Sequence, residues 1–167
     1  NSTIGFSKTP PYCGIPGVAD FNQDGIPEVY ITNKIFNAQN GNLLVNGGMN
    51  GLGYSFVKFR YFIPVSIAAQ LDNEPDLELA AGYTIYKIQI NNLNDTIGNR
   101  LNPLNIIIDN EYFDGCTSVA DVNQDGILDV IVVSSSDNRK PVLYAYCIIN
   151  DKLTLIAKTN IPAIENV

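Results

Sequence analysis

Two stretches of the chain are nearly identical: VADFNQDGIPEVYI at residues 18–31 and VADVNQDGILDVIV at residues 119–132. Each contains the pattern Asp-x-Asn-x-Asp-Gly-x-x-(Glu/Asp), and each continues into a short apolar run rich in β-branched residues. Oxygen ligands at this spacing suit Ca²⁺, which takes about 6–8 carboxylate, amide, carbonyl or water oxygens. Short β-branched runs favour strands. The two stretches therefore predict calcium-binding loops that each lead into a β-strand.

The two loops offer the same set of ligands. In each loop, polar side chains at alternate positions point inward, the glycine allows a sharp turn, and a final carboxylate closes the site. The predicted ligands are Asp20, Asn22, Asp24, the carbonyl of Ile26 and Glu28 in the first loop, and Asp121, Asn123, Asp125, the carbonyl of Ile127 and Asp129 in the second. We expect two bound Ca²⁺ ions with a structural role. A polar turn without an ion is the alternative, and its recurrence with the same flanking residues favours the ion.

A helical calcium loop of the EF-hand or dockerin type begins in the same way. Such a loop needs a bidentate carboxylate at its twelfth position and a helix on each side. The twelfth position is Ile31 in one stretch and Val132 in the other. Both residues are apolar, and this excludes the helical loops.

A third, degraded copy is expected between the two, in VSIAAQLDNEPDLELAAG at residues 65–82. If Asp76 is aligned with Asp129, Ala68 takes the place of the first ligand and Asn73 that of the glycine. The remnants of a site are then Gln70, Asp72 and Asp76, and we expect this loop to bind no ion or to bind it weakly. Loop starts at residues 20, 68 and 121 give spacings of 48 and 53 residues. A repeat of this length is typical of a four-stranded propeller blade.

The segments after each loop predict further strands. Residues 34–38 and 42–45 flank a Gln-Asn-Gly turn, residues 83–90 alternate in polarity, and residues 142–149 and 153–157 flank Asn-Asp-Lys. Connections are expected at residues 46–54, 91–103 and 137–141. No stretch has sustained helical periodicity. The chain is therefore predicted to be all-β, with about three four-stranded antiparallel blades at residues 13–60, 61–110 and 111–167.

The paired loops resemble FG-GAP repeats, also called the VCBS or integrin-α-like family. That family forms seven-bladed β-propellers with this calcium loop between the first and second strands of a blade. The resemblance covers three blades and is specific at the loops. The Phe-Gly and Gly-Ala-Pro elements of the integrin versions are missing, and only Ala-Ala-Gly at residues 80–82 is similar to the second. The bacterial secreted relatives are therefore the closer comparison.

This resemblance implies a secreted or cell-surface module that binds a protein or carbohydrate ligand. It also implies that the chain is an arc of a larger ring, completed by remaining blades or by a partner chain. Three blades would leave two sheet faces uncovered, and we expect the isolated chain to associate or aggregate. The residues expected on those faces are Ile35, Phe36, Ile88, Ile131 and Tyr144. The absence of an initiator Met and of a signal peptide fits a processed chain or a fragment.

The composition of the chain limits the kinds of molecule that it is expected to bind. The chain has 167 residues and a formal net charge of −7, which two Ca²⁺ ions would reduce to −3. An acidic surface poor in Lys and Arg argues against binding to nucleic acid or to anionic membranes. No apolar run approaches the roughly 18 residues of a membrane span, and we expect no membrane insertion.

Catalysis has little support in the sequence. The chain has no His, which removes Ser/His and Cys/His nucleophile pairs and imidazole bases. One unassigned acidic cluster, Asp109, Glu111 and Asp114, is expected to be a solvated loop. A non-catalytic module is preferred, and the alternative is a propeller scaffold or accessory part of a secreted polysaccharide-degrading enzyme. Aromatic residues that pack the blades, or alternatively line a ligand surface, are Tyr54, Phe56, Phe59, Tyr61, Phe62, Tyr112 and Phe113.

Cysteine is present in an odd number, as Cys13, Cys116 and Cys147. At most one intramolecular disulfide can form. We expect buried, unpaired thiols.

Overall fold

The computed structural model describes residues 14–48, 51–53, 56–57, 60–61, 63–105, 114–136 and 139–162. These residues form β-strands joined by turns and loops, and no helix occurs among them. Within the same ranges, no helix is available that could cross a membrane. The predicted all-β class is confirmed.

Three four-stranded sheets account for most of the strands. Sheet A consists of β1 (Gly17–Ala19), β2 (Glu28–Ile31), β3 (Lys34–Asn37) and β4 (Leu43–Asn46). Sheet B consists of β7 (Ser66–Ala69), β8 (Glu78–Ala81), β9 (Thr84–Gln89) and β10 (Arg100–Asn105). Sheet C consists of β11 (Cys116–Ala120), β12 (Asp129–Ser136), β13 (Arg139–Ile149) and β14 (Lys152–Asn160). A short hairpin of β5 (Phe56–Val57) and β6 (Arg60–Tyr61) lies between sheets A and B in the sequence.

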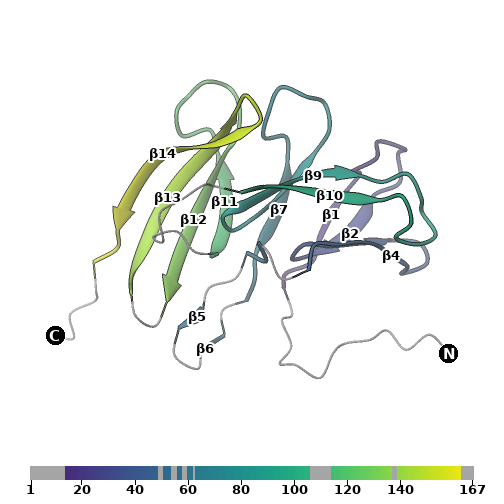
Figure 1. Cartoon of the computed structure of the whole chain (residues 1–167), viewed down its shortest axis with the longest axis horizontal. Coiled ribbons are helices and arrows are strands. Elements are labelled where there is room, and N and C mark those ends of the chain that lie inside the picture. Colours follow the sequence, from purple (N-terminus) through teal and green to yellow (C-terminus); the bar gives the residue numbers. More distant parts are fainter. Residues whose placement is uncertain are drawn as a thin grey trace.

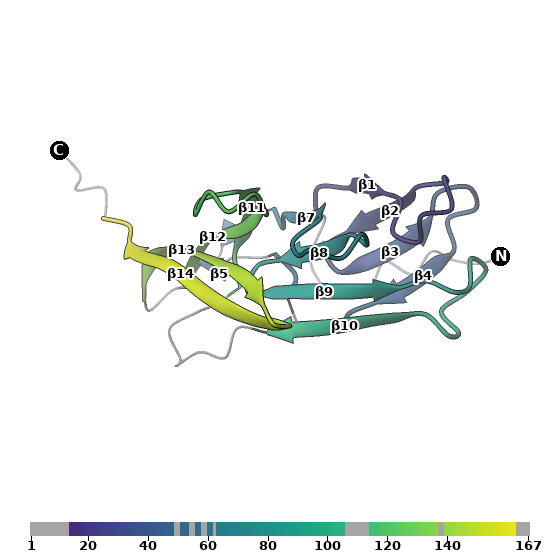
Figure 2. The same ribbon diagram turned by 90° about the horizontal axis from the view of Figure 1, so that it is seen from above.

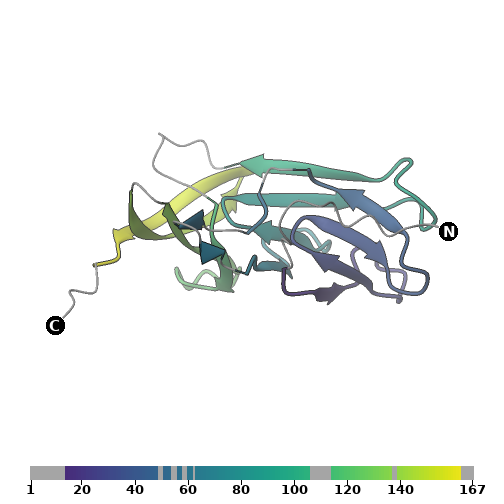
Figure 3. The same cartoon turned by 90° about the horizontal axis from the view of Figure 1, so that it is seen from below.

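Each sheet is a simple antiparallel meander, because every strand pairs with the next one along the chain. The three sheets stand side by side in chain order, with sheet B between the other two (Figure 1 and Figure 3). Their first strands lie along one edge of the molecule, and β7 contacts both β1 and β11 (Figure 2). Their last strands lie along the opposite edge, where β10 contacts β4 and β14. All three sheets are open.

The core consists of two apolar layers, one on each face of sheet B. The layer between sheets A and B contains Phe21, Tyr30, Ile35, Leu44, Val45, Leu79, Ala81 and Tyr86. The layer between sheets B and C contains Ala69, Leu71, Ala80, Ile85, Val130, Val132, Tyr144 and Tyr146. Successive side chains of a strand point to opposite faces, so a strand of the central sheet contributes to both layers. All four residues of β8 are accordingly buried.

The sheets stack head to tail. Tyr30 pairs with Ile35 on the face that sheet A turns toward sheet B, and the equivalent pair, Ala80 and Ile85, lies on the face that sheet B turns toward sheet C. The equivalent pair in sheet C is Ile131 and Ala145. By the alternation of the strand, this last pair lies on the face turned away from sheet B. The face that carries this pair is therefore turned toward the next sheet along the chain, and the opposite face is turned toward the previous sheet.

Tyrosine hydroxyls join the sheets across these layers. The hydroxyl of Tyr30 accepts the backbone N–H of Ala68 at 3.0 Å, and that of Tyr146 donates to the carbonyl of Gly82. The hydroxyl of Tyr86 accepts the side-chain amide of Asn33, from the turn between β2 and β3, at 3.2 Å and donates to the carbonyl of Gly51 at 3.3 Å. Buried hydroxyl groups without such partners would cost free energy, so these bonds help to fix how the sheets are stacked.

Two expectations about the strands are wrong. Residues 100–105 form β10, although a connection was expected as far as residue 103. Pro103 fits there because β10 is an edge strand, where one side of the backbone needs no ladder partner. Ile35 and Tyr144 are buried between sheets, and Ile88 packs against the layer between sheets A and B, so these three do not line an uncovered face. A one-residue difference along a strand decides between the two faces.

Candidate metal centre

The two intact loops connect the first and second strands of sheets A and C. Ala19 pairs with Glu28 across β1 and β2, and Ala120 pairs with Asp129 across β11 and β12. We call residues 20–28 loop A and residues 121–129 loop C. Each loop thus begins directly after its first strand, and its ninth residue is the first residue of the next strand.

Turn hydrogen bonds organise loop A around its acidic side chains. Asp20 accepts the backbone N–H of Asp24 at 3.1 Å and that of Gly25 at 2.9 Å. Asn22 Oδ1 accepts the N–H of Asp24 at 3.1 Å, and Asp24 Oδ1 accepts the N–H of Ile26 at 2.8 Å. The side chains at alternate positions are therefore all turned toward the inside of the loop.

Loop C repeats this arrangement bond for bond. Asp121 accepts the N–H of Asp125 at 3.1 Å and that of Gly126 at 2.9 Å. Asn123 Oδ1 accepts the N–H of Asp125 at 2.9 Å, and Asp125 Oδ1 accepts the N–H of Ile127 at 2.9 Å. The sixth position has positive φ in both loops, 86° at Gly25 and 91° at Gly126, which explains the glycine. The two predicted sites therefore have one geometry.

The ninth carboxylate of each loop is buried. Glu28 is 2% exposed and Asp129 is 0% exposed. Glu28 Oε2 accepts the N–H of Phe21 at 2.9 Å, and Asp129 Oδ2 accepts the N–H of Val122 at 2.9 Å. The other oxygen of Asp129, Oδ1, is buried and has no hydrogen-bond partner among the described residues. Because an unpaired buried anionic oxygen is costly, a cation beside it would be favoured.

Charge repulsion in loop A would also favour a bound cation. Burial raises the pKa of Glu28, and the negative charges of Asp24 and Asp20 raise it further. The negative charges of Asp24 and Asp20 thus act on Glu28 in a loop that contains no basic residue. A bound divalent cation would offset this repulsion.

The carboxylates of these loops are not gathered as a ready-made cluster. Within the described ranges, no three His, Cys, Asp or Glu side chains converge on a point that could hold a metal ion. Asn22 Nδ2 instead donates to Asp24 Oδ2 at 3.0 Å, and Asn123 Nδ2 donates to Asp125 Oδ2 at 2.9 Å. A carboxylate oxygen has more than one acceptor position, so the turn bonds can persist while the asparagine amides reorient toward a cation. Coordination of a cation would therefore require these side chains to move.

The middle loop lies two residues later than the sequence alignment placed it. Ala69 pairs with Glu78, as Ala19 pairs with Glu28, so the equivalent loop, loop B, comprises residues 70–78. The first ligand is therefore replaced by Gln70, not by Ala68, and the loops begin at residues 20, 70 and 121. The spacings become 50 and 51 residues, which are more regular than expected.

Sequence reasoning missed the closing residue of loop B, Glu78. Its Oε2 accepts the N–H of Leu71 at 2.9 Å, as the ninth carboxylates of the other loops do. The apolar run that follows Glu78 could have revealed it, because Glu28 and Asp129 stand directly before the same kind of run.

Loop B has lost the backbone conformation of the other two loops. Pro75 stands at the place of Gly25, and proline cannot adopt positive φ. Neither Pro75 nor Asn73 has a positive φ, whereas Gly25 and the residue before Asp24, Gln23, both do. Gln70 uses its Nε2 to donate to the carbonyl of Glu74 at 2.9 Å. These differences are consistent with a loop that does not hold a divalent ion.

The remaining two members of the predicted remnant site are Asp76, which contacts loop A, and Asp72, which forms a bond within loop B. Gln23 of loop A donates to Asp76 Oδ1 at 2.8 Å and to the carbonyl of Pro75 at 3.0 Å. Asp72 Oδ1 accepts the N–H of Glu74 at 2.8 Å. Loops A and B are thus joined by one side chain.

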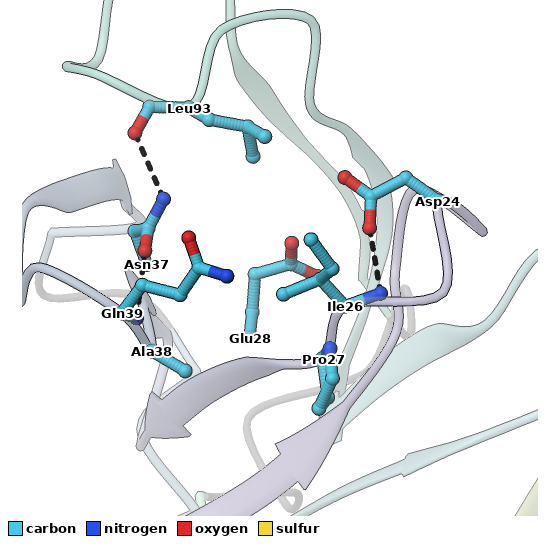
Figure 4. Close-up of a pocket in the computed structure, with 8 residues that line it drawn as sticks. All are labelled: Asp24, Ile26, Pro27, Glu28, Asn37, Ala38, Gln39 and Leu93. Atoms are coloured by element: carbon cyan, nitrogen blue, oxygen red, sulfur yellow. Dashed lines mark hydrogen bonds between the residues drawn. The ribbon is translucent and has the colours of Figure 1, made fainter.

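A small pocket opens beside loop A (Figure 4). It is lined by Asp24, Ile26, Pro27, Glu28, Asn37, Ala38, Gln39 and Leu93. Asn37 Nδ2 donates to the carbonyl of Leu93 at 3.1 Å, which holds the loop before β10 against the turn between β3 and β4. Gln39 and Glu28 both line this pocket (Figure 4).

The other residues singled out in the sequence have structural roles where they can be described. Asp114 accepts the backbone N–H groups of Leu52 at 2.7 Å and of Gly53 at 3.0 Å, so its carboxylate organises a turn. Cys147 is buried and free, as expected, and Cys116 is free and half-buried. Phe56 and Tyr61 pair through their backbones in the β5–β6 hairpin. Outside the described residues lie Cys13, Tyr54, Phe59, Phe62, Asp109, Glu111, Tyr112 and Phe113.

Comparison of the chain with protein-family models, curated proteins and solved structures found no significant match.

Proposed function

We propose that the chain is a calcium-binding segment of a β-propeller of the FG-GAP, or VCBS, type. In this proposal, loops A and C each bind one Ca²⁺ and loop B binds none. The observation that carries it is the identical geometry of two acidic loops that end in a buried carboxylate, together with the unpaired Oδ1 of Asp129. The residues fit the ion, because carboxylate, amide and carbonyl oxygens are the ligands that Ca²⁺ prefers.

The proposed arrangement of blades is supported by the way the sheets are stacked. Each sheet is a four-stranded meander, and successive sheets pack head to tail through equivalent faces. The repeat of 50 and 51 residues suits one such sheet with its loops. The predicted blade boundaries at residues 60 and 110 stay a prediction.

The proposed role is non-catalytic adhesion or ligand binding in a secreted or cell-surface protein. Loops A and B contact each other through Gln23, and calcium in loop A would hold this shared surface in one conformation. The chain has no His, and its described acidic residues are engaged in turns or in loops A, B and C. The chemistry of the protein or carbohydrate ligand rests on the family resemblance.

A calcium titration followed by amide NMR tests the metal sites one by one. We expect the amide signals of Gly25 and Gly126 to shift with CaCl₂, since both N–H groups donate to ligating carboxylates, and that of Glu74 in loop B to stay constant. Asp24→Asn should abolish the shift in loop A only, and Asp125→Asn the shift in loop C only. Unchanged spectra at millimolar CaCl₂ would contradict calcium binding.

A glycan array probed with the labelled chain tests the binding role. Retention in CaCl₂ that is lost in EGTA supports a calcium-shaped ligand surface. Cleavage of a retained polysaccharide would instead support the enzyme-associated alternative. Retention that EGTA does not alter would contradict a role for calcium in shaping the surface.

A further inference from the structure

One position on the third strand of each sheet faces the ninth residue of the loop. Asn37 pairs with Glu28 in sheet A, and Lys87 pairs with Glu78 in sheet B. In sheet C, the register continues from the pair of Val130 and Tyr146, and this brings Cys147 beside Asp129. A neutral amide, an ammonium group and a thiol thus occupy equivalent places. Among these three positions, only the one beside loop B carries a positively charged side chain.

The Lys87 ammonium reaches into loop B. Its Nζ lies 3.0 Å from Asp72 Oδ2, at the third position of the loop. The other two loops have a neutral asparagine there, Asn22 or Asn123. Compared with loops A and C, loop B therefore has an additional carboxylate and an ammonium, and it lacks the first acidic ligand and the turn glycine. The side chain of Asp72 is only 11% exposed, so this contact is partly shielded from water.

The same ammonium links two sheets. Lys87 Nζ lies 2.8 Å from Asp151 Oδ1, at the tip of the hairpin between β13 and β14. Asn150 and Asp151 have positive φ of 51° and 58°, which is the conformation of a tight two-residue hairpin turn. The turn holds Asp151 over sheet B, although 64 residues separate it from Lys87.

We propose that the ammonium group of Lys87 replaces the divalent cation in loop B, so that this loop is held without metal and is tied to sheet C through Asp151. An ammonium is a compact cation with three hydrogen-bond donors, and here it contacts two carboxylates. It also lies across the ladder from the buried Glu78 and offsets part of the effect of burial on the pKa of that carboxyl. This inference rests on the proposed function of loops A and C.

Thermal unfolding in EGTA tests the role of Lys87 without calcium. We expect Lys87→Met to lower the Tm by about 2–4 °C, the shift that corresponds to about 1 kcal/mol for a chain of this size. The drop should be the same in EGTA and in CaCl₂. Lys152→Met, at an exposed lysine beside Asp151, is the control for loss of one positive charge and should leave the Tm nearly unchanged.

A double-mutant cycle separates the ion pair from general effects of substitution. If Lys87 and Asp72 act together, Lys87→Met combined with Asp72→Asn should lower the Tm no further than the single variants do. Additive losses, or a Lys87→Met variant as stable as wild type, would overturn the proposal. The cycle is measured in EGTA, so its outcome does not depend on calcium binding at loops A and C.

A gain of metal binding provides the second test. Gln70→Asp and Pro75→Gly together with Lys87→Asn give loop B the first ligand and the turn glycine of loop A and the amide found at Asn37. We expect CaCl₂ to shift the Glu74 amide signal in this variant and not in wild type. A wild-type chain that binds calcium in loop B would overturn the proposal. A wild-type chain that binds none in loops A and C would overturn the proposed function alone, since the cycle in EGTA still reports on Lys87.

Discussion

Gly82 and Asp114 lie in direct contact where sheet B meets sheet C: a Cβ atom on Gly82 would lie 1.7 Å from Asp114 Oδ1. The φ of Gly82 is +60°, in the left-handed region. Its N–H donates to Thr117 Oγ1 at 2.8 Å, and its carbonyl accepts the hydroxyl of Tyr146. The backbone of this glycine therefore joins the two sheets, and Asp114 closes the remaining space.

Gly82→Ala is expected to destabilise the chain. The backbone conformation alone costs about 1–3 kcal/mol for a residue with a side chain, and the contact with Asp114 adds to it. Gly41→Ala is the matched control, because Gly41 has a φ of +74° and open space around its Cβ position. Urea unfolding of both variants measures the difference. Equal losses would show that the contact with Asp114 can relax without cost.

Removal of calcium should lower the Tm. An ion that binds only the folded chain stabilises it by about 2.7 kcal/mol at a hundredfold excess over Kd. Asp24→Ala and Asp125→Ala should each reduce the shift between CaCl₂ and EGTA, because each removes one ligand. Glu74→Ala is the control, since Glu74 holds the equivalent position in loop B. A melting curve that EGTA leaves in place would mean that loops A and C are ordinary turns.

Stability in EGTA should fall as pH rises toward neutrality. Burial is the main cause that raises the pKa of Glu78 from 4.5 to about 7, and Asp72 contributes as a like charge. Between these values the folded chain binds more protons than the unfolded chain does. The free energy of unfolding therefore decreases as pH rises through this window, by up to about 3 kcal/mol, and levels off above it.

Glu78→Gln should remove most of this slope. Part of it will remain, because burial also raises the pKa of Glu28. Urea unfolding at several pH values between 4.5 and 7.5, in about half-unit steps, provides the measurement. Glu74→Gln, at an exposed residue of the same loop, is the control. A Glu78→Gln variant with the wild-type slope would show that another group is responsible.

The isolated 167-residue chain is expected to self-associate. The outer face of sheet C carries Ile131, Val133 and Leu143, and Val133 is 42% exposed. By the head-to-tail pattern, this face matches the outer face of sheet A in a second copy, where Val29 pairs with Phe36. A contact of this kind joins different surfaces and can continue from copy to copy.

Sedimentation velocity across a range of concentrations checks this expectation. Val133→Glu should shift the distribution toward monomer, because it places a charge on the face that would be covered. Ile97→Glu, at a residue 75% exposed in the loop before β10, should not. A wild-type chain that stays monomeric at all concentrations, with a cooperative melt, would contradict the proposed architecture.

The sequence by itself determined the local features of this protein. The turns of loops A and C were predicted from the sequence, since the hydrogen bonds within each loop join groups at most seven residues apart. The hairpins were predicted for the same reason: their turns use the short-range preferences of Asn, Asp and Gly. The all-β class followed from alternating and β-branched runs.

Only the tertiary structure decided the register and the partners. The pair of Ala69 and Glu78 moved loop B by two residues, and the packing of sheet B between two neighbours decided that Ile35 and Tyr144 are buried. Lys87 forms an ion pair with Asp151 because sheets B and C stack, and no spacing in the sequence predicts this contact. The physical reason is that local turns are closed by nearby donors and acceptors, whereas the cation that contacts Asp72 and Asp151 comes from a strand that only packing brings close to them.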